Sequence, residues 1–193
     1  MPAELRLNDP FSIITLPMAG HDGPFPWETR FAWPRSGDLQ IAFDDQSRDA
    51  RNVWASRLDQ AVAQADRAVL LVAENAACLA AIWWARLSPA QYVDKVAGAL
   101  LFDPPSVDLL NRSGKTLFAS PDAALPFPSL IVDRADRGGA LARSCGGHLL
   151  NAPATPPIAT GMWRQAHRLI ERLSAGVVEQ DLRLLRTLGL SDQ

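Results

Sequence analysis

The stretch VLLVAENAACLAAIWWA, residues 69–85, places an apolar strand directly before an apolar helix, with only Glu74 and Asn75 between them. A strand without polar alternation is covered on both faces, as in parallel sheets. A helix that is apolar along most of its length has to be buried against the rest of the protein. This junction therefore restricts the chain to an α/β fold built around a central parallel strand.

Short apolar runs recur along the chain and alternate with helical patterns, which is typical of a parallel sheet with helices on both faces. The predicted strands are residues 11–16, 39–43, 68–73, 97–102, 129–133 and 148–151. In such a sheet, ligands bind beyond the carboxyl ends of the strands. We therefore expect the loops after the first, third, fifth and sixth strands to form one crevice.

Helical spacing of apolar residues places helices between these strands. Val53, Trp54, Leu58 and Val62 predict one buried stripe between the second and third strands. Further helices are predicted after Asn75, over about residues 137–143, and from an N-cap at Thr160 to a stop at Gly176.

The length of 193 residues with 48% hydrophobic content is enough for one substantial core. We predict one domain over residues 1–176, followed by an amphipathic helical extension over residues 177–193. Val178, Leu182 and Leu185 form one stripe of that extension. This stripe either packs on the domain's own core or docks onto a protein partner or a second copy of the chain.

Charge and composition exclude several partners. The 19 basic and 21 acidic residues are spread along the chain, so no basic stripe for nucleic acid or for a membrane surface is present. Cys78 and Cys145 have no CxxC spacing, no metal-ligating cluster is evident, and no cofactor is predicted. The N-terminal residues do not resemble a signal peptide, and the longest apolar run is far shorter than the roughly 20 residues of a membrane span. These features predict a cytoplasmic protein with free thiols and with small molecules or proteins as partners.

The junction at Asn75 has the shape of a nucleophile elbow but not its chemistry. Such an elbow reads G-x-S-x-G, and the corresponding positions here are Ala73, Glu74, Asn75, Ala76 and Ala77. Asparagine tolerates a positive φ, so Asn75 can occupy the strained apex. Its amide is not a nucleophile. The alternative interpretation is a plain strand–turn–helix junction with asparagine as its turn residue.

Several segments, in order, resemble one known family. They are LPMAGHDGP, NVWASRLDQAV, LLVAENAACLAAIWWA, AGALLFDPPSVD, LPFPSLIV and GGHLLNAP, and they cover roughly residues 10–173. They are similar to the small serine hydrolases typified by YdeN and retinoblastoma-binding protein nine, within the α/β-hydrolase superfamily. The resemblance implies a single-domain, three-layer α/β-hydrolase fold with about six mostly parallel strands and no lid domain.

The same resemblance implies a degenerate catalytic triad. It places Glu74 on the family's histidine before the nucleophile and Asn75 on the nucleophile itself. The acid corresponds to Asp136, or to Asp133 if the register shifts, and the base histidine corresponds to Pro157. A serine hydrolase needs both a nucleophile and a base to move its protons. We therefore predict a catalytically inactive protein.

The pocket can persist without the chemistry. Gly20 and His21 follow the first strand, where the family's oxyanion loop lies, and Ala76 begins a helix with free backbone N–H groups. A small carbonyl or anionic ligand is predicted at these residues together with Glu74 and Asn75. The negative charge of Glu74 opposes an anion there unless it pairs with an arginine such as Arg134 or Arg137.

Three functions follow from these patterns. The first is an inactive α/β-hydrolase-fold protein that binds a small ligand or a protein. The second is an active carboxylic-ester or acyl hydrolase with relocated residues, for example Cys78 or a loop serine with His21 or His148. The third is an assembly role through the C-terminal helix.

Overall fold

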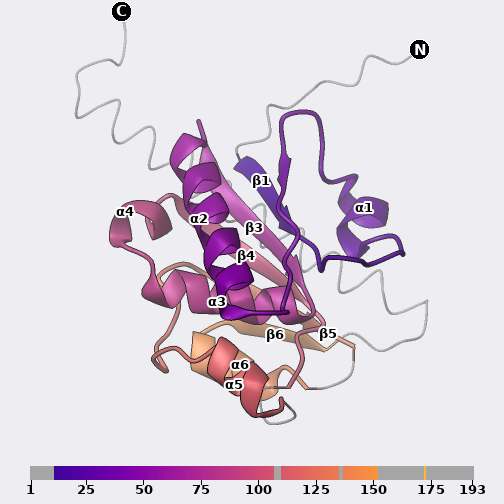
Figure 1. Cartoon of the computed structure of the whole chain (residues 1–193). Coiled ribbons are helices and arrows are strands. Elements are labelled where there is room, and N and C mark those ends of the chain that lie inside the picture. Colours follow the sequence, from indigo (N-terminus) through magenta and orange to yellow (C-terminus); the bar gives the residue numbers. More distant parts are fainter. Residues whose placement is uncertain (1–10, 107–109, 135–136, 152–171, 173–193) are drawn as a thin grey trace, which may run out of the picture.

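Six parallel strands form one sheet in the order β2-β1-β3-β4-β5-β6 (Figure 1). The computed structural model describes residues 11–106, 110–134, 137–151 and residue 172. The strands are β1 (Phe11–Leu16), β2 (Leu39–Gln40), β3 (Ala68–Glu74), β4 (Val96–Phe102), β5 (Ser129–Asp133) and β6 (His148–Asn151). The predicted α/β class and the sheet of about six strands are confirmed.

Strand β3 is central because it pairs on both sides. Val72 lies beside Thr15 of β1 and Leu100 of β4, and it is fully buried. The side chains of β3 alternate between two cores, with Leu71 and Ala73 on one face of the sheet and Val72 on the other. Burial on both faces explains the unbroken aliphatic sequence of this strand.

Among the described residues, the helices that cover the first face of the sheet include α2 (Arg48–Gln64), α3 (Ala76–Leu87), α5 (Arg112–Leu117) and α6 (Gly139–Cys145). Their buried side chains belong to one core with the facing strand residues. The α2 stripe consists of Trp54, Leu58 and Val62, all less than 4% exposed, whereas Val53 is 55% exposed. The inclusion of Val53 in that stripe was wrong, because adjacent residues point about 100° apart around a helix.

The opposite face is covered by helix α1 (Pro26–Phe31) and its flanks. Four aromatic side chains pack there against β1, β3 and β4: Phe25, Trp27, Phe31 and Trp33. In Figure 1, α1 lies apart from α2 and α3. Helices on both faces of the sheet are thereby confirmed. The short helix α4 (Ala90–Val93) leads into β4.

Strand β2 and helix α6 differ from their predicted bounds by two residues or more. Strand β2 covers Leu39–Gln40 rather than residues 39–43, and only a single bridge between Met18 and Phe43 continues the pairing. Pro17 ends β1 because it has no backbone N–H to donate to a neighbouring strand. Helix α6 begins at Gly139, two residues later than predicted.

Two further elements were predicted in the chain beyond β6. The helix over residues 160–176 and the extension over residues 177–193 lie outside the described residues. Within the described residues, no helix is both long and apolar enough to span a bilayer.

Candidate functional site

The carboxyl ends of four strands bring polar side chains together. His21 follows β1 and lies 3.8 Å from Glu74, the last residue of β3, measured from Nδ1 to Oε1. Asp103 follows β4 and forms an ion pair with Arg134, which follows β5. The loops after the first, third and fifth strands therefore meet at this edge, and the loop after the fourth strand lies there too. The residues after β6 lie outside the described part of the chain.

Asn75 stands alone between β3 and α3 in a strained conformation. Its φ is 50° and its ψ is -132°, which is a sparsely populated region for any residue except glycine. The backbone N–H of Asn75 donates to the Phe102 carbonyl at 2.9 Å, and the Asn75 carbonyl accepts from the Cys78 N–H at 3.1 Å. Ala73 and Ala77 on either side are fully buried. This is the tight turn that an elbow requires, with an exposed amide at its apex.

Glu74 is a buried carboxylate that faces the α1 side of the sheet. It is 8% exposed, and its Oε1 has no hydrogen-bond partner among the described residues. Burial raises the pKa of Glu74, and the nearby His21 ring opposes that shift. Arg134, one of the two arginines considered as a partner for Glu74, pairs with Asp103 instead, because its Nε donates to Asp103 Oδ2 at 2.7 Å.

Glu74→Gln is expected to stabilise the protein at neutral pH. The folded state holds the Glu74 proton more tightly than the unfolded state, so this group's stabilising contribution falls as pH rises through the folded pKa. Removing the buried charge should raise the free energy of unfolding by about 1 kcal/mol at pH 8 and by less at pH 5. Urea unfolding at both pH values measures this. Asp66→Asn, an exposed carboxylate, serves as the control, and a constant difference between Glu74→Gln and wild type would contradict the expectation.

His21 is held by aromatic stacking. Its ring centroid lies 4.9 Å from that of Phe25, and Phe25 stacks in turn on Trp27 at 4.9 Å. The His21 side chain remains 40% exposed. Gly20 before it has a φ of 74°, which glycine adopts without strain. His21 and Glu74 are thus brought together, on the far side of the sheet from the helix α3.

Asp133 accepts hydrogen bonds from the backbone. It is the last residue of β5 and only 1% exposed. Its Oδ2 accepts the backbone N–H groups of Arg137 and Gly138, just before α6 begins. These bonds also explain the late start of α6. The other acid candidate, Asp136, and the base position, Pro157, lie outside the described residues.

The cysteine and histidine candidates for a relocated site lie in different parts of the fold. Cys78 is fully buried, its Sγ donates to the Phe102 carbonyl at 3.4 Å, and burial raises its pKa well above the usual range for a thiol. His148 begins the edge strand β6 beside Leu130, three strands away from β3, which leads into Asn75. Cys145 is also a free, buried thiol, with its pKa raised to about 11 by burial.

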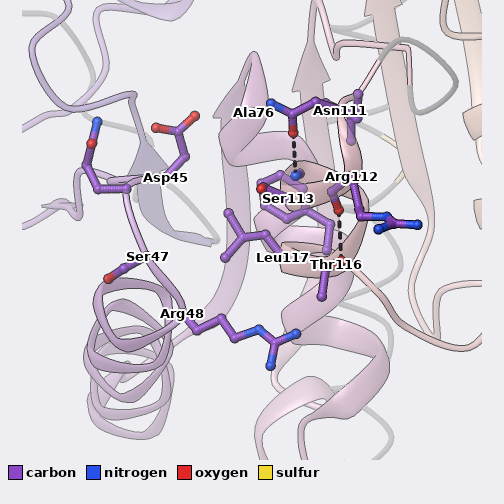
Figure 2. A pocket seen from close by; sticks show the side chains of 13 residues that line it. Asp45, Ser47, Arg48, Ala76, Asn111, Arg112, Ser113, Thr116 and Leu117 are labelled. Atoms are coloured by element: carbon purple, nitrogen blue, oxygen red, sulfur yellow. Dashed lines mark hydrogen bonds between the residues drawn. The ribbon is translucent and has the colours of Figure 1, made fainter.

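A cleft with a volume of about 710 Å³ lies next to the elbow, on the face of the sheet that α2, α3 and α5 cover. The loop before α2 forms one wall, α5 forms the other, and Ala76 lines it from the start of α3 (Figure 2). In α5, the Gly114 N–H donates to Asn111 Oδ1 at 2.8 Å and caps the helix. Ala76 is the one member of the predicted ligand set that lines this cleft.

The α5 wall was not predicted from the sequence. The segment NRSGKTLF, residues 111–118, is polar and carries no clear apolar stripe. The sequence signal that could have indicated this helix is Asn111, a residue type favoured at the N-cap. Within the described residues, no group of three or more histidine, cysteine, aspartate or glutamate side chains could hold a metal ion.

Comparisons with known proteins agree with the fold described above. The chain is similar to a YdeN-like hydrolase from Pectobacterium atrosepticum, with a TM-score of 0.60, 14% identity, and coverage of 84% of this chain and 92% of that chain. It is also similar to esterase 2 from Thermogutta terrifontis, solved in a form phosphoramylated by tabun, with a TM-score of 0.53, 15% identity, and coverage of 89% and 87%. The curated proteins contain no match.

These two likenesses show the α/β-hydrolase fold. The family model described as "Serine hydrolase" matches residues 13–157, which is more than half of the chain. The strands, the elbow and the cleft described above lie almost entirely within this range. The chain therefore belongs to this serine hydrolase family of α/β-hydrolase proteins.

Proposed function

We propose that this family member does not hydrolyse esters and instead binds a small carbonyl or anionic ligand in the cleft beside the elbow. The observation that carries the proposal is Asn75. Its backbone has the strained geometry of a nucleophile position, while its side chain is an amide. A ligand can therefore reach the apex without being attacked.

The covalent route of a serine hydrolase fails here at two steps. The nucleophile must give its proton to a base, and the base must return that proton to the leaving group. Asn75 offers no nucleophilic oxygen that a base could activate, and Pro157 at the base position by resemblance cannot accept a proton. Loss of both groups removes the proton transfers while leaving the fold intact.

The cleft has the size and the hydrogen-bond donors that favour binding of a small ligand. Its volume of about 710 Å³ suits a small organic ligand. Helix α3 has 12 residues and begins at the cleft, so its first-turn N–H groups and positive dipole end favour a ligand oxygen there.

An ester assay tests the proposal. The purified protein is offered p-nitrophenyl acetate and butyrate and a fluorophosphonate probe, and neither turnover nor labelling is expected. Asn75→Ser alone should stay unlabelled because a base is still missing, whereas Asn75→Ser combined with Pro157→His should gain labelling. Asn75→Ala combined with Pro157→His is the matched control and should not label.

Two results would overturn the proposal. One is ester turnover by the wild-type protein that a single serine, cysteine or histidine substitution abolishes. The other is full labelling of Asn75→Ser alone, which would show that a working base is already present elsewhere.

One observation favours a second candidate function, an active ester or acyl hydrolase. His21 and Glu74 form a histidine–carboxylate pair, which is the arrangement of a general base and its orienting acid. In this case wild-type turnover should be present and His21→Ala should abolish it. The cytoplasmic location and the docking of a protein partner or second copy through Val178, Leu182 and Leu185 stay predictions.

A further inference from the structure

The cleft beside the elbow has a basic wall. Arg48 lines it from the first turn of α2, and its side chain extends towards α5 (Figure 2). Arg51 follows one helical turn later and lies behind that wall. Its Nη1 donates to the carbonyl of Leu117, a cleft residue, and its guanidinium lies 3.8 Å from the centroid of the Trp83 ring.

Arg51 is a buried cation without a carboxylate partner in the described part of the chain. It is 9% exposed, and its other hydrogen bonds go to the side-chain oxygen of the neighbouring Asn52. Burial lowers the pKa of Arg51, and the positive charge of Arg48 lowers it further. A buried charge is costly unless an opposite charge compensates it. The electrostatics of this wall therefore favour an anion in front of it.

The other charged groups of the cleft do not cancel this field. Arg112 also lines the cleft, and Asp45 is the one carboxylate among the described lining residues. Among the described residues, Asp45 forms no ion pair with Arg48 or Arg112. The lining thus carries two arginines and one carboxylate, and Arg51 adds a third positive charge behind Leu117.

Part of the cleft lining is apolar. Ala76, Leu110, Leu117 and Phe118 contribute to it. Its volume of about 710 Å³ exceeds what a bare phosphate or carboxylate needs. Accordingly, a ligand that matches both the basic and the apolar parts of the lining has a negatively charged group and an apolar body.

We infer that this cleft binds an organic anion, with its carboxylate or phosphate group on Arg48 and its apolar part against Leu110, Leu117 and Phe118. The inference rests on the proposed function, because it names the ligand class of the same cleft. Carboxylate and phosphate share the chemistry that a guanidinium recognises. The experiment therefore has to distinguish carboxylate ligands from phosphate ligands.

Isothermal titration calorimetry with hexanoate, hexyl phosphate and hexanol tests the inference at constant ionic strength. At least one of the two anions should bind about tenfold more tightly than hexanol, which has the same apolar chain without the charge. Tighter binding of hexanoate assigns the carboxylate class, and tighter binding of hexyl phosphate assigns the phosphate class. Raising the salt concentration should weaken anion binding and leave hexanol binding unchanged.

Arg48→Gln should lower the affinity for the preferred anion about tenfold. Arg57→Gln is the matched control, since Arg57 is exposed on the same helix, carries the same charge and does not line the cleft. Equal binding of hexanol and both anions, or equal losses in the two arginine variants, would overturn the inference without restoring ester turnover. An active esterase that still prefers an anion through Arg48 would overturn the proposed function alone.

Discussion

Asp133→Ala is expected to lower the free energy of unfolding by about 3 kcal/mol. The Asp133 carboxylate is almost fully buried and accepts two backbone N–H groups, those of Arg137 and Gly138. Alanine leaves both donors without that acceptor, and hydrogen bonds to a charged group are stronger than neutral ones. Urea unfolding followed by circular dichroism measures the loss.

Asp133→Asn is the control for this prediction. It keeps one acceptor oxygen at nearly the same position, so it should cost less than Asp133→Ala. If Asp133→Ala were as stable as wild type, the carboxylate would not be holding the start of α6. Asp133 would then again be free to act as the acid of a catalytic site.

Trp27→Ala is expected to cost about 3 to 5 kcal/mol, the usual range for removing a large buried aromatic side chain. Trp27 is fully buried in α1, stacks on Phe25 at 4.9 Å and contacts Phe102 of β4 at 5.9 Å between ring centroids. Since a domain is typically stable by only about 5 to 15 kcal/mol, the midpoint of urea unfolding should fall sharply.

Trp27→Phe separates packing from hydrogen bonding. The Trp27 Nε1 is buried without a hydrogen-bond partner among the described residues, so phenylalanine loses no bond there. Its cost should be about 1 kcal/mol, from lost volume alone. A loss as large as that of Trp27→Ala would contradict this interpretation and would indicate that the indole N–H has a partner.

The sheet was predictable because its strands are buried on both faces. Runs such as AVLLVA leave no other way to cover so much apolar surface, and five of the six predicted strands match within one residue at each end. The second strand was predicted too long because Leu39 and Gln40 lie exposed at the sheet edge, where burial does not select the sequence.

The site was less predictable because it depends on distances between side chains. The positive φ of Asn75 followed from local sequence, since a turn between a strand and a helix favours asparagine there. The pairing of Arg134 with Asp103 could not be read in the same way, because it joins the ends of two different strands. Arg48 and Arg51 likewise resemble ordinary surface arginines until α5 is placed beside them.

The connection between β3 and α3 is a single residue long. Glu74 ends the strand, Ala76 begins the helix, and Asn75 alone must reverse the direction of the chain. One residue can do this only with a backbone of the wrong hand for most side chains. The choice of residue at this position is therefore dictated first by how short the link is. With so short a link, the position accepts only glycine, asparagine or another residue that tolerates a positive φ, whatever chemistry its side chain performs.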